Sequence, residues 1–202
     1  MMNSTKSNIL TSKFAYSRGS EMKPLENFVG YYIEADITDA TPAAKAFATT
    51  DVDTSTETIS ETSHGFITGN IGQFTTTDTL PAGLSLSTDY FVIKVDDDSY
   101  KVATSLANAK AGTAVNITDQ GVGTHTFTPT SLTSASIKLQ GTAVDQPTEN
   151  DWQDIADSSV NVTATGKKAF NVSGTYYSRV RYYITLSGGQ LDISAIFVGK
   201  GA

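Results

Sequence analysis

The two histidines are the side chains best suited to acid–base or metal chemistry, because imidazole titrates near neutral pH and binds metals. The chain has 202 residues, and its histidines are His64, in a Ser-His-Gly turn, and His125, which alternates with threonines in GTHTFT. One interpretation pairs them as metal ligands or as a general base. The chain contains no cysteine, so a His/Cys zinc site cannot form. We therefore expect a turn histidine and an exposed strand histidine, with no catalytic or metal-binding role.

Carboxylates gather in two places where a cation could bind, at Asp96-Asp97-Asp98 and in the region 145–157. Hard cations favour several carboxylate ligands, but three consecutive side chains at a hairpin tip do not converge on one ion, and the spacing of an EF-hand is absent. Enzyme motifs are missing as well: there is no GxSxG elbow and no P-loop Lys-Ser/Thr pair. The sequence predicts solvated turns, no metal or cofactor site, and no enzyme.

A row of aromatic and basic side chains is the strongest candidate for binding. In YSRVRYYITL, residues 177–186, these side chains project opposite to Val180 and Tyr182. Aromatic and Arg enrichment marks protein interfaces and carbohydrate platforms alike, whereas the alternative is ordinary cross-strand pairing on an exposed sheet. We predict an interface, to which three basic residues near the N-terminus could add contacts with an acidic partner. The candidate interface residues are Tyr177, Arg179, Arg181, Tyr183, Lys6, Lys13 and Arg18.

Composition indicates which elements hold these residues. Hydrophobic residues make up 39% of the chain and charged residues only 17%, below the roughly 25% charged that is usual for globular domains. Thr, Ser, Ala and Gly take their place, and small polar and β-branched residues suit pleated, half-buried surfaces. The composition predicts a β protein.

Charge and hydropathy limit the partners. The formal net charge is -7, and residues 52–130 alone carry nine acidic and three basic side chains. Phosphate contacts need clustered Lys and Arg, so we expect no nucleic-acid partner. No stretch resembles a signal peptide or approaches the ~18 apolar residues of a membrane span. We expect a protein that is made in the cytoplasm and has no membrane partner.

Two kinds of strand pattern divide the chain. Residues 28–38 alternate cleanly, as a half-buried strand does. Between 52 and 130, short runs alternate with turn signals, and DYFVIKV and SYKVATS around DDDS form the strongest hairpin. SLANAK is the one helical segment expected there, and Gly112 ends it. The short strand candidates are 56–61, 71–77, 89–95, 100–104, 114–118 and 124–128.

The two ends of the chain give different signals. Residues 134–202 contain longer alternating strands, and Ser187-Gly188-Gly189 separates two of them. Small residues between two alternating runs predict an antiparallel hairpin. Residues 1–27 show no sustained periodicity, which predicts an extended arm that is ordered only on a partner, or a disordered tail.

The strand count indicates a discontinuous domain. A sandwich usually needs about seven strands, and residues 131–202 supply fewer. Docking 28–51 onto them solves this, because a lone strand cannot bury its face, and it makes 52–130 an insertion. The predicted organisation is all-β: an extended N-terminal arm at 1–27, a discontinuous antiparallel β-sandwich of 28–51 plus 131–202, and an inserted small SH3-like β-barrel at 52–130.

Two long segments resemble modules of bacteriophage virion proteins. The first runs from Ser63 to Pro129, carries the strings LPAGL, DYFV and YKVA, and resembles a small barrel module common in phage virions. The second runs from Ile137 to Gly201, carries KLQ, Trp152 and the closing GQLDISAIFVGKG, and resembles a β-sandwich repeatedly encoded among phage structural genes. The loop TAVDQPTEND departs from this pattern, where a short Asn/Asp-Gly turn is expected.

The resemblance implies a structural virion protein, assembled in the host cytoplasm. The specific expectation is a capsid surface decoration or minor capsid protein that docks on the major capsid protein or on tail proteins. We also expect a homo-oligomer, with a trimer as one form, because small cores without disulfides gain stability from contacts between subunits. The alternative is a receptor- or carbohydrate-binding accessory protein of a tail or spike.

Overall fold

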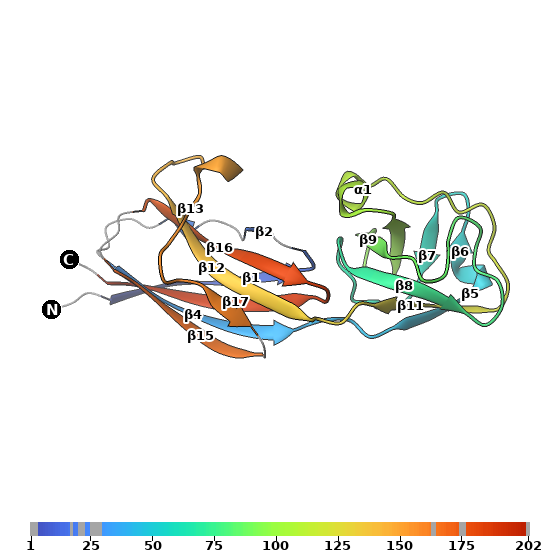
Figure 1. Ribbon diagram of the computed structural model, residues 1–202, viewed down its shortest axis with the longest axis horizontal. Helices are drawn as coiled ribbons and strands as arrows, with labels where there is room; N and C mark the ends of the chain where they lie inside the picture. The colour runs from blue at the N-terminus through green and yellow to red at the C-terminus, as the bar shows by residue number, and fades with distance from the viewer. Residues whose placement is uncertain are drawn as a thin grey trace. The chain divides into compact units, whose positions relative to one another are not determined.

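The structure is a computed structural model that describes residues 4–16, 18–19, 23–24, 30–162, 165–173 and 177–200. Strands dominate, and every sheet pairing described is antiparallel, so the predicted all-β fold with antiparallel sheets is confirmed. The chain divides into two compact units (Figure 1). Unit 1 comprises Met1–Ala40, Thr133–Ser187 and Leu191–Ala202, and unit 2 comprises Thr41–Leu132 and Gly188–Gln190.

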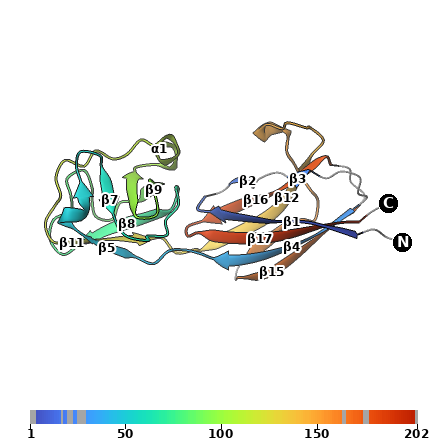
Figure 2. The same ribbon diagram turned by 180° about the vertical axis from the view of Figure 1, so that it is seen from behind.

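The first sheet of unit 1 has four strands that lie side by side (Figure 2). Ile33, Ala35 and Ile37 are fully buried, which confirms the predicted alternation from residue 32 onward; residues 28 and 29 lie outside the described part of the chain. Leu191 and Ile193 of the neighbouring strand are buried on the same face. The strand order is β1 (Ser4–Phe14), β17 (Leu191–Lys200), β4 (Gly30–Asp39) and β15 (Gly166–Ser173).

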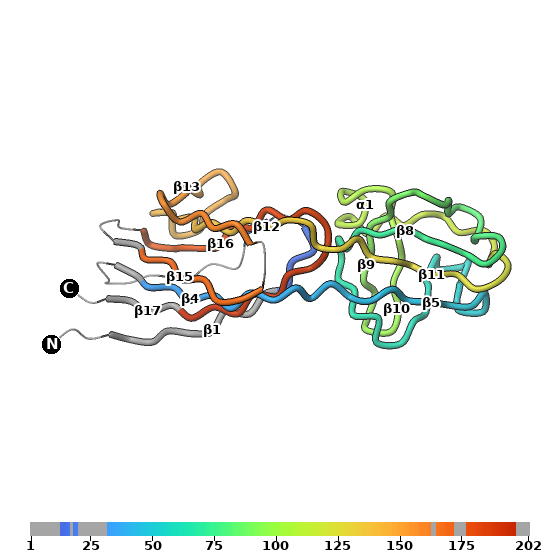
Figure 3. The backbone as a smooth tube through the Cα atoms, turned by 60° about the horizontal axis from the view of Figure 1, so that its bottom comes forward, coloured from blue at the N-terminus to red at the C-terminus, as the bar shows by residue number. Residues whose placement is uncertain are grey.

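The second sheet of unit 1 forms a separate layer (Figure 3). Ile137, Leu139 and Ile184 are fully buried, and the rings of Phe170 and Tyr182 approach across the core with centroids 6.3 Å apart. Two facing layers with a shared apolar interior make a β-sandwich. The strands are β13 (Gln153–Asp154), β12 (Ser134–Thr142), β16 (Arg179–Ser187) and β2 (Arg18–Gly19), with β14 (Val160–Val162) on β12 and β3 (Lys23–Pro24) on β16.

The turn at Ser187–Gly189 is not the predicted hairpin. β16 pairs with β12, β2 and β3, whereas β17 pairs with β1 and β4, so the strands on either side of the turn belong to different sheets. Gly188 and Gly189 both have a φ of 68°, and the Gly189 N–H donates to the carbonyl of Thr130 over 2.9 Å. Alternation identifies the buried face of each strand but not its partner, which explains the error.

The predicted N-terminal arm is corrected for Ser4–Phe14. These residues form β1 at one edge of the first sheet, in a register that runs from Ser4 opposite Lys200 to Phe14 opposite Leu191. Phe14 is fully buried. An exposed sheet edge can order a polar segment through backbone hydrogen bonds alone, so the absence of an apolar period does not exclude a strand.

Unit 2 is built on one seven-stranded sheet with its own core. The rings of Phe66, Phe74, Tyr100 and Phe127 are packed together, with Phe66 and Phe127 centroids 5.4 Å apart. No described pairing joins the two terminal strands of the sheet, so the SH3-like barrel is not confirmed. The strand order is β5 (Lys45–Ala48), β11 (Thr124–Pro129), β8 (Ile71–Thr76), β9 (Tyr90–Lys94), β10 (Ser99–Ala103), β7 (Thr58–Ser60) and β6 (Val52–Asp53).

Local predictions in unit 2 have different outcomes. The hairpin around DDDS is confirmed, with β9 paired to β10. The short helix is confirmed as α1 (Leu106–Ala111), which Ser105 caps by accepting from the Asn108 N–H and which ends at Gly112 with a φ of 74°. The strand expected at 114–118 is absent, because Val115 and Thr118 donate their N–H groups to two separate segments. Two 3-10 turns, η1 (Thr49–Asp51) and η2 (Glu149–Asp151), complete the described helical elements.

Candidate functional site

The predicted interface row lies on the face of β16 opposite to the sandwich core. Val180, Tyr182 and Ile184 are buried in the core, so Arg179, Arg181 and Tyr183, at the alternate positions, project to the other side. Across the pair, the corresponding positions of β12 are Thr142, Gln140 and Lys138. Tyr177 is not part of this row: an added Cβ at Gly141, which shares the face of β12 with the buried Ile137 and Leu139, would come within 2.4 Å of the Tyr177 ring.

The chain covers this row with its own residues 143–158. Arg181 is only 5% exposed, because its guanidinium donates from Nη1 and Nη2 to the two Glu149 carboxylate oxygens over 2.9 and 2.7 Å. Its Nε donates to Gln140 Oε1 over 3.0 Å, and its Cζ lies 4.3 Å from the Trp152 ring centroid. Arg181 is therefore a buried anchor, and the row is not an open face.

Two further ion pairs hold the same loop. Arg179 Nη2 contacts Asp145 Oδ1 at 3.3 Å, and Lys138 Nζ contacts Asp154 Oδ2 at 2.6 Å. The hydrogen bond from Lys138, followed by one from Gln140, lowers the pKa of the Asp154 carboxyl. Residues 143–158 contain five acidic and no basic side chains. Residues 143–158 thus supply one carboxylate to each cation of β12 and β16.

The N-terminal candidates lie apart from these ion pairs. Lys13 and Arg18 are exposed, and Arg18 donates to the Lys13 carbonyl over 2.8 Å while its Cζ lies 5.0 Å from the Phe14 ring centroid. The side chain of Lys6 lies outside the described part of the chain. β2 places Gly19 beside the row, where a Cβ would meet the Arg181 guanidinium at 2.6 Å.

The sequence alone did not identify Glu149 and Trp152 as the partners of Arg181. One signal for this pairing was present in the sequence: residues 143–158 contain several carboxylates and no basic side chain, and they follow a predicted strand that carries Lys138. Complementary charge on neighbouring segments predicts ion pairing, but which carboxylate meets which cation depends on the path of the loop.

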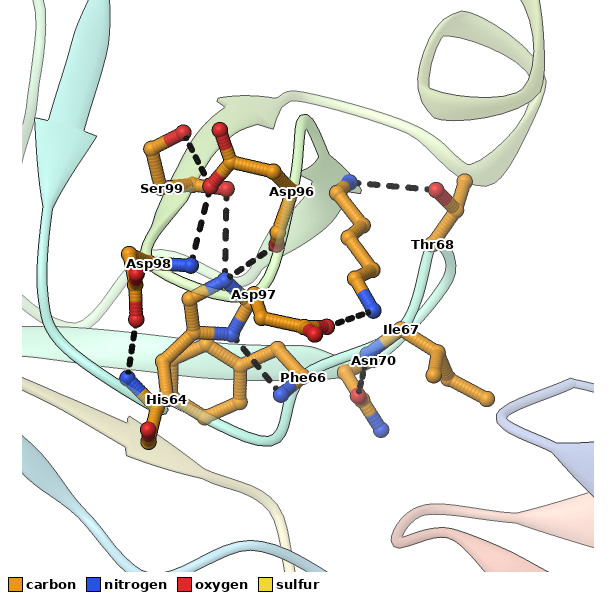
Figure 4. A network of polar contacts seen from close by, with 11 residues as sticks. His64, Phe66, Ile67, Thr68, Asn70, Asp96, Asp97, Asp98 and Ser99 are labelled. Carbon is orange, nitrogen blue, oxygen red and sulfur yellow. Dashed lines mark hydrogen bonds and ion pairs between the residues drawn. The ribbon is translucent and has the colours of Figure 1, made fainter.

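His64 holds two segments of unit 2 together through hydrogen bonds of its ring (Figure 4). Its ring is buried, and Nε2 lies 3.0 Å from the Asp96 carbonyl and 3.2 Å from the Ser99 carbonyl. The Phe66 N–H donates to Nδ1 over 2.9 Å. These partners assign the neutral Nε2–H tautomer. With both nitrogens engaged, His64 joins the turn at Ser63–Gly65 to the tip of the β9–β10 hairpin.

His125 is buried, so the predicted exposed strand histidine is wrong. Its Nδ1 lies 2.9 Å from Thr76 Oγ1 and its Nε2 lies 3.2 Å from the Gln120 carbonyl, which again assigns an Nε2–H donor. Phe127, two residues later, is also buried. Strand periodicity places both side chains on one face, and the apolar Phe127 decides which face is inward.

The acidic hairpin tip is held by hydrogen bonds within the chain (Figure 4). Asp96 Oδ1 accepts from the Asp98 N–H and from Ser99 Oγ, and the bond from Ser99 is the main cause of its lowered pKa. Asp98 Oδ1 accepts from the Ser63 N–H over 2.8 Å. In the part of the chain that the structure describes, no group of three or more His, Asp or Glu side chains is placed to hold a metal ion.

Comparison with known proteins adds little to this geometry. No protein-family model and no curated protein matches the chain. Among solved structures, the penton protein of mavirus aligns with a TM-score of 0.24 and 7% sequence identity, over 96% of this chain and 100% of that chain. A likeness at this score carries no argument. Among the described residues, no helix has the length and apolar character needed to cross a membrane.

Proposed function

We propose that this chain is a structural component of a bacteriophage virion, a capsid surface decoration or minor capsid protein that docks on neighbouring virion subunits. The supporting observation is that each virion-like sequence pattern falls almost entirely within one of the two compact units. The pattern Ser63–Pro129 lies wholly within unit 2, and the pattern Ile137–Gly201 lies within unit 1 except for Gly188–Gln190. A pattern that spans one compact unit is what a transferable module produces.

The use of polar groups also favours a structural role over catalysis. Both histidines bridge turns and strands through both ring nitrogens. The hairpin-tip carboxylates accept from local backbone and hydroxyl groups, and the loop carboxylates pair with cations of the sheet. A catalytic group needs a free coordination or proton-transfer position, and these side chains are committed to holding the fold.

Docking would draw on the edges of the first sheet in unit 1. β1 and β15 are the terminal strands in its order, so each has one backbone edge without a described strand partner. Such edges accept a strand or loop from a neighbour. In a symmetric particle, each modest contact is repeated over many copies, and several contacts per copy raise the overall affinity.

The test is the composition of purified particles. We expect mass spectrometry of density-gradient-purified virions to detect this chain at a fixed ratio to the major capsid protein, and cryo-EM to place it on the capsid lattice or vertices. Particles free of the chain, made by a host that expresses it abundantly, would rule out the virion role. Density at the tail tip would exclude decoration and favour the alternative below.

A receptor- or carbohydrate-binding accessory protein is the second candidate. It is favoured by the gathering of Trp152, Tyr183 and two arginines at one site, because aromatic rings and guanidinium groups are common in sugar platforms. Binding of the isolated protein to a glycan array, lost in a Trp152→Ala variant that remains folded, would support it. The decoration role predicts no glycan binding.

A further inference from the structure

The guanidinium of Arg181 sits in a preorganised carboxylate site. Its Nε is held by Gln140 at 3.0 Å, and its plane lies over Trp152 at 4.3 Å, while Gln140 is itself held by Asp154 at 2.8 Å. Gln140 lies on β12 and Asp154 on β13, outside the turn that supplies Glu149, so these contacts keep the fork of Nη1 and Nη2 oriented without it. A planar fork fixed in this way binds a carboxylate with two parallel hydrogen bonds.

The segment that fills this site is held by polar contacts near its surface. We call residues 143–150 the flap. Seven of its eight residues are exposed, and the eighth, Pro147, is half-buried. The paired side chains are exposed as well, 93% for Asp145 and 78% for Glu149. The exposed Arg179–Asp145 pair contributes little stability, whereas the bidentate pair of Glu149 with Arg181, whose side chain is 5% exposed, is the stronger of the two contacts that hold the flap. Because the flap has no buried apolar contacts, it opens easily once a competing carboxylate replaces Glu149.

The rest of the loop is anchored independently of the flap. Ile155 and Ser158 are buried, the Ile155 N–H donates to the Leu139 carbonyl over 2.9 Å, and the Leu139 N–H donates to Ser158 Oγ over 3.0 Å. β13 also pairs with β12. The flap can therefore leave while β13 and the strands beneath it stay in place, provided that the hydrogen bonds between Thr148 and Asp151 break.

We infer that Arg179 and Arg181 form a docking site for an acidic segment of a partner protein, and that the flap occupies this site in the isolated chain. The flap shows what the site recognises, namely two carboxylates four residues apart, as in Asp145 and Glu149. Because the flap is tethered to the site, its effective concentration there is high and it competes with any free peptide. A partner therefore reaches the two arginines only when other contacts hold its acidic segment close to them. This docking site is a property of the isolated chain and does not depend on a virion role.

The test compares peptide binding to the two arginines with and without the competing carboxylates of the flap. The variant D145N/E149Q keeps the side-chain sizes of the flap but removes the two charges that meet the arginines. The probe is a fluorescein-labelled peptide of residues 143–151, AVDQPTEND, followed by fluorescence anisotropy at low salt. We expect it to bind the variant about tenfold or more tightly than the unmodified chain, because the competing intramolecular carboxylates are gone. The matched peptide AVNQPTQND should not bind.

A third substitution tests the arginine fork. Arg181→Lys in the D145N/E149Q background keeps the charge but removes the fork, and should weaken peptide binding by about tenfold. Because Arg181 is buried, Arg179→Gln in the same background is a second variant, and emission of Trp152, the only tryptophan, reports whether unit 1 remains folded in each. Equal affinity of the unmodified chain and D145N/E149Q for AVDQPTEND, or equal binding of the neutral peptide, would overturn the inference.

Discussion

Tyr100 places a hydroxyl group inside the aromatic core of unit 2. The residue is fully buried, its ring packs edge-on against Phe66 with centroids 5.1 Å apart, and its hydroxyl oxygen has no hydrogen-bond partner among the described residues. Burial is the main cause of the raised pKa of this phenol. An unpaired buried hydroxyl costs about 1–3 kcal/mol. We expect Tyr100→Phe to keep the ring contacts and to raise the free energy of unfolding by about 1 kcal/mol in urea denaturation.

Tyr90 supplies the matched control for this prediction. It is buried in the same core, but its hydroxyl oxygen accepts from the Ser85 N–H over 2.9 Å. Tyr90→Phe should therefore lower the free energy of unfolding by about 1 kcal/mol. If both substitutions were equally destabilising, the hydroxyl of Tyr100 would have a partner and the reasoning from its burial would be wrong.

The turn after β6 makes the stability of unit 2 depend on pH. Asp53 accepts from the hydroxyl and N–H of Ser55 at 2.6 and 2.8 Å and from Thr56 Oγ1 at 2.8 Å. The hydrogen bond from the Ser55 hydroxyl, followed by the others, lowers the pKa of this carboxyl from 3.8 to about 2. The ionised Asp53 carboxylate therefore stabilises the folded state at pH values above its ordinary pKa of 3.8, and this stabilisation is lost as the pH falls through the pKa of about 2 in the folded state.

We therefore expect Asp53→Asn to lower the melting temperature of unit 2 at pH 6, and the difference from the unmodified chain to shrink as the pH falls from 3.8 towards about 2. Calorimetry over this range measures the effect. Ser55→Ala removes the largest cause and should raise the pKa of Asp53 in an NMR titration towards its ordinary value. A pKa that does not move would show that the Ser55 hydroxyl is not the donor that matters.

The turn between β16 and β17 requires glycine at position 189. Gly189 has a φ of 68°, and an added Cβ would lie 2.6 Å from the Leu132 backbone. Gly112 has a similar φ of 74° but nothing within 4 Å of the corresponding position. We expect Gly112→Ala to cost about 1 kcal/mol of left-handed strain, and Gly189→Ala to cost about 3 kcal/mol or more because a backbone clash is added. Urea denaturation compares them, and equal costs would contradict the clash.

The elements differ in how far the sequence could predict them. The strand β4, the β9–β10 hairpin and α1 were predictable because each is specified locally, by alternation, by a turn or by a cap and a left-handed glycine. The pairing of β16 and the strand β1 were not, because partner choice between layers and edge pairing depend on contacts distant in sequence. The row on β16 was predictable from periodicity. Its covering by Glu149 and Trp152 was not, since the path of a loop leaves no periodic signal.

At the scale of the whole molecule, unit 2 has the features of a self-sufficient domain. Its core cluster, which includes Phe47, Phe66 and Tyr100, draws every member from residues 47–127. β5 near its start pairs with β11 near its end, with Lys45 opposite Phe127, so the chain enters and leaves at adjacent strands. A domain inserted between two strands must have neighbouring ends, and a core that lies entirely between those ends can form without the rest of the chain.

We therefore expect a polypeptide of residues 41–132 to fold alone. It lacks the hydrogen bonds from Gly189 to the Thr130 carbonyl and from Gln190 to Thr41 Oγ1, whose loss should cost about 1 kcal/mol each. Circular dichroism should show one cooperative thermal transition, slightly below the unit 2 transition of the full chain. In the full chain, emission of Trp152 reports the unfolding of unit 1 alone, so it distinguishes the transition of unit 1 from that of unit 2. A fragment without a cooperative transition would show that the core of unit 2 needs unit 1, and that the two units fold as one.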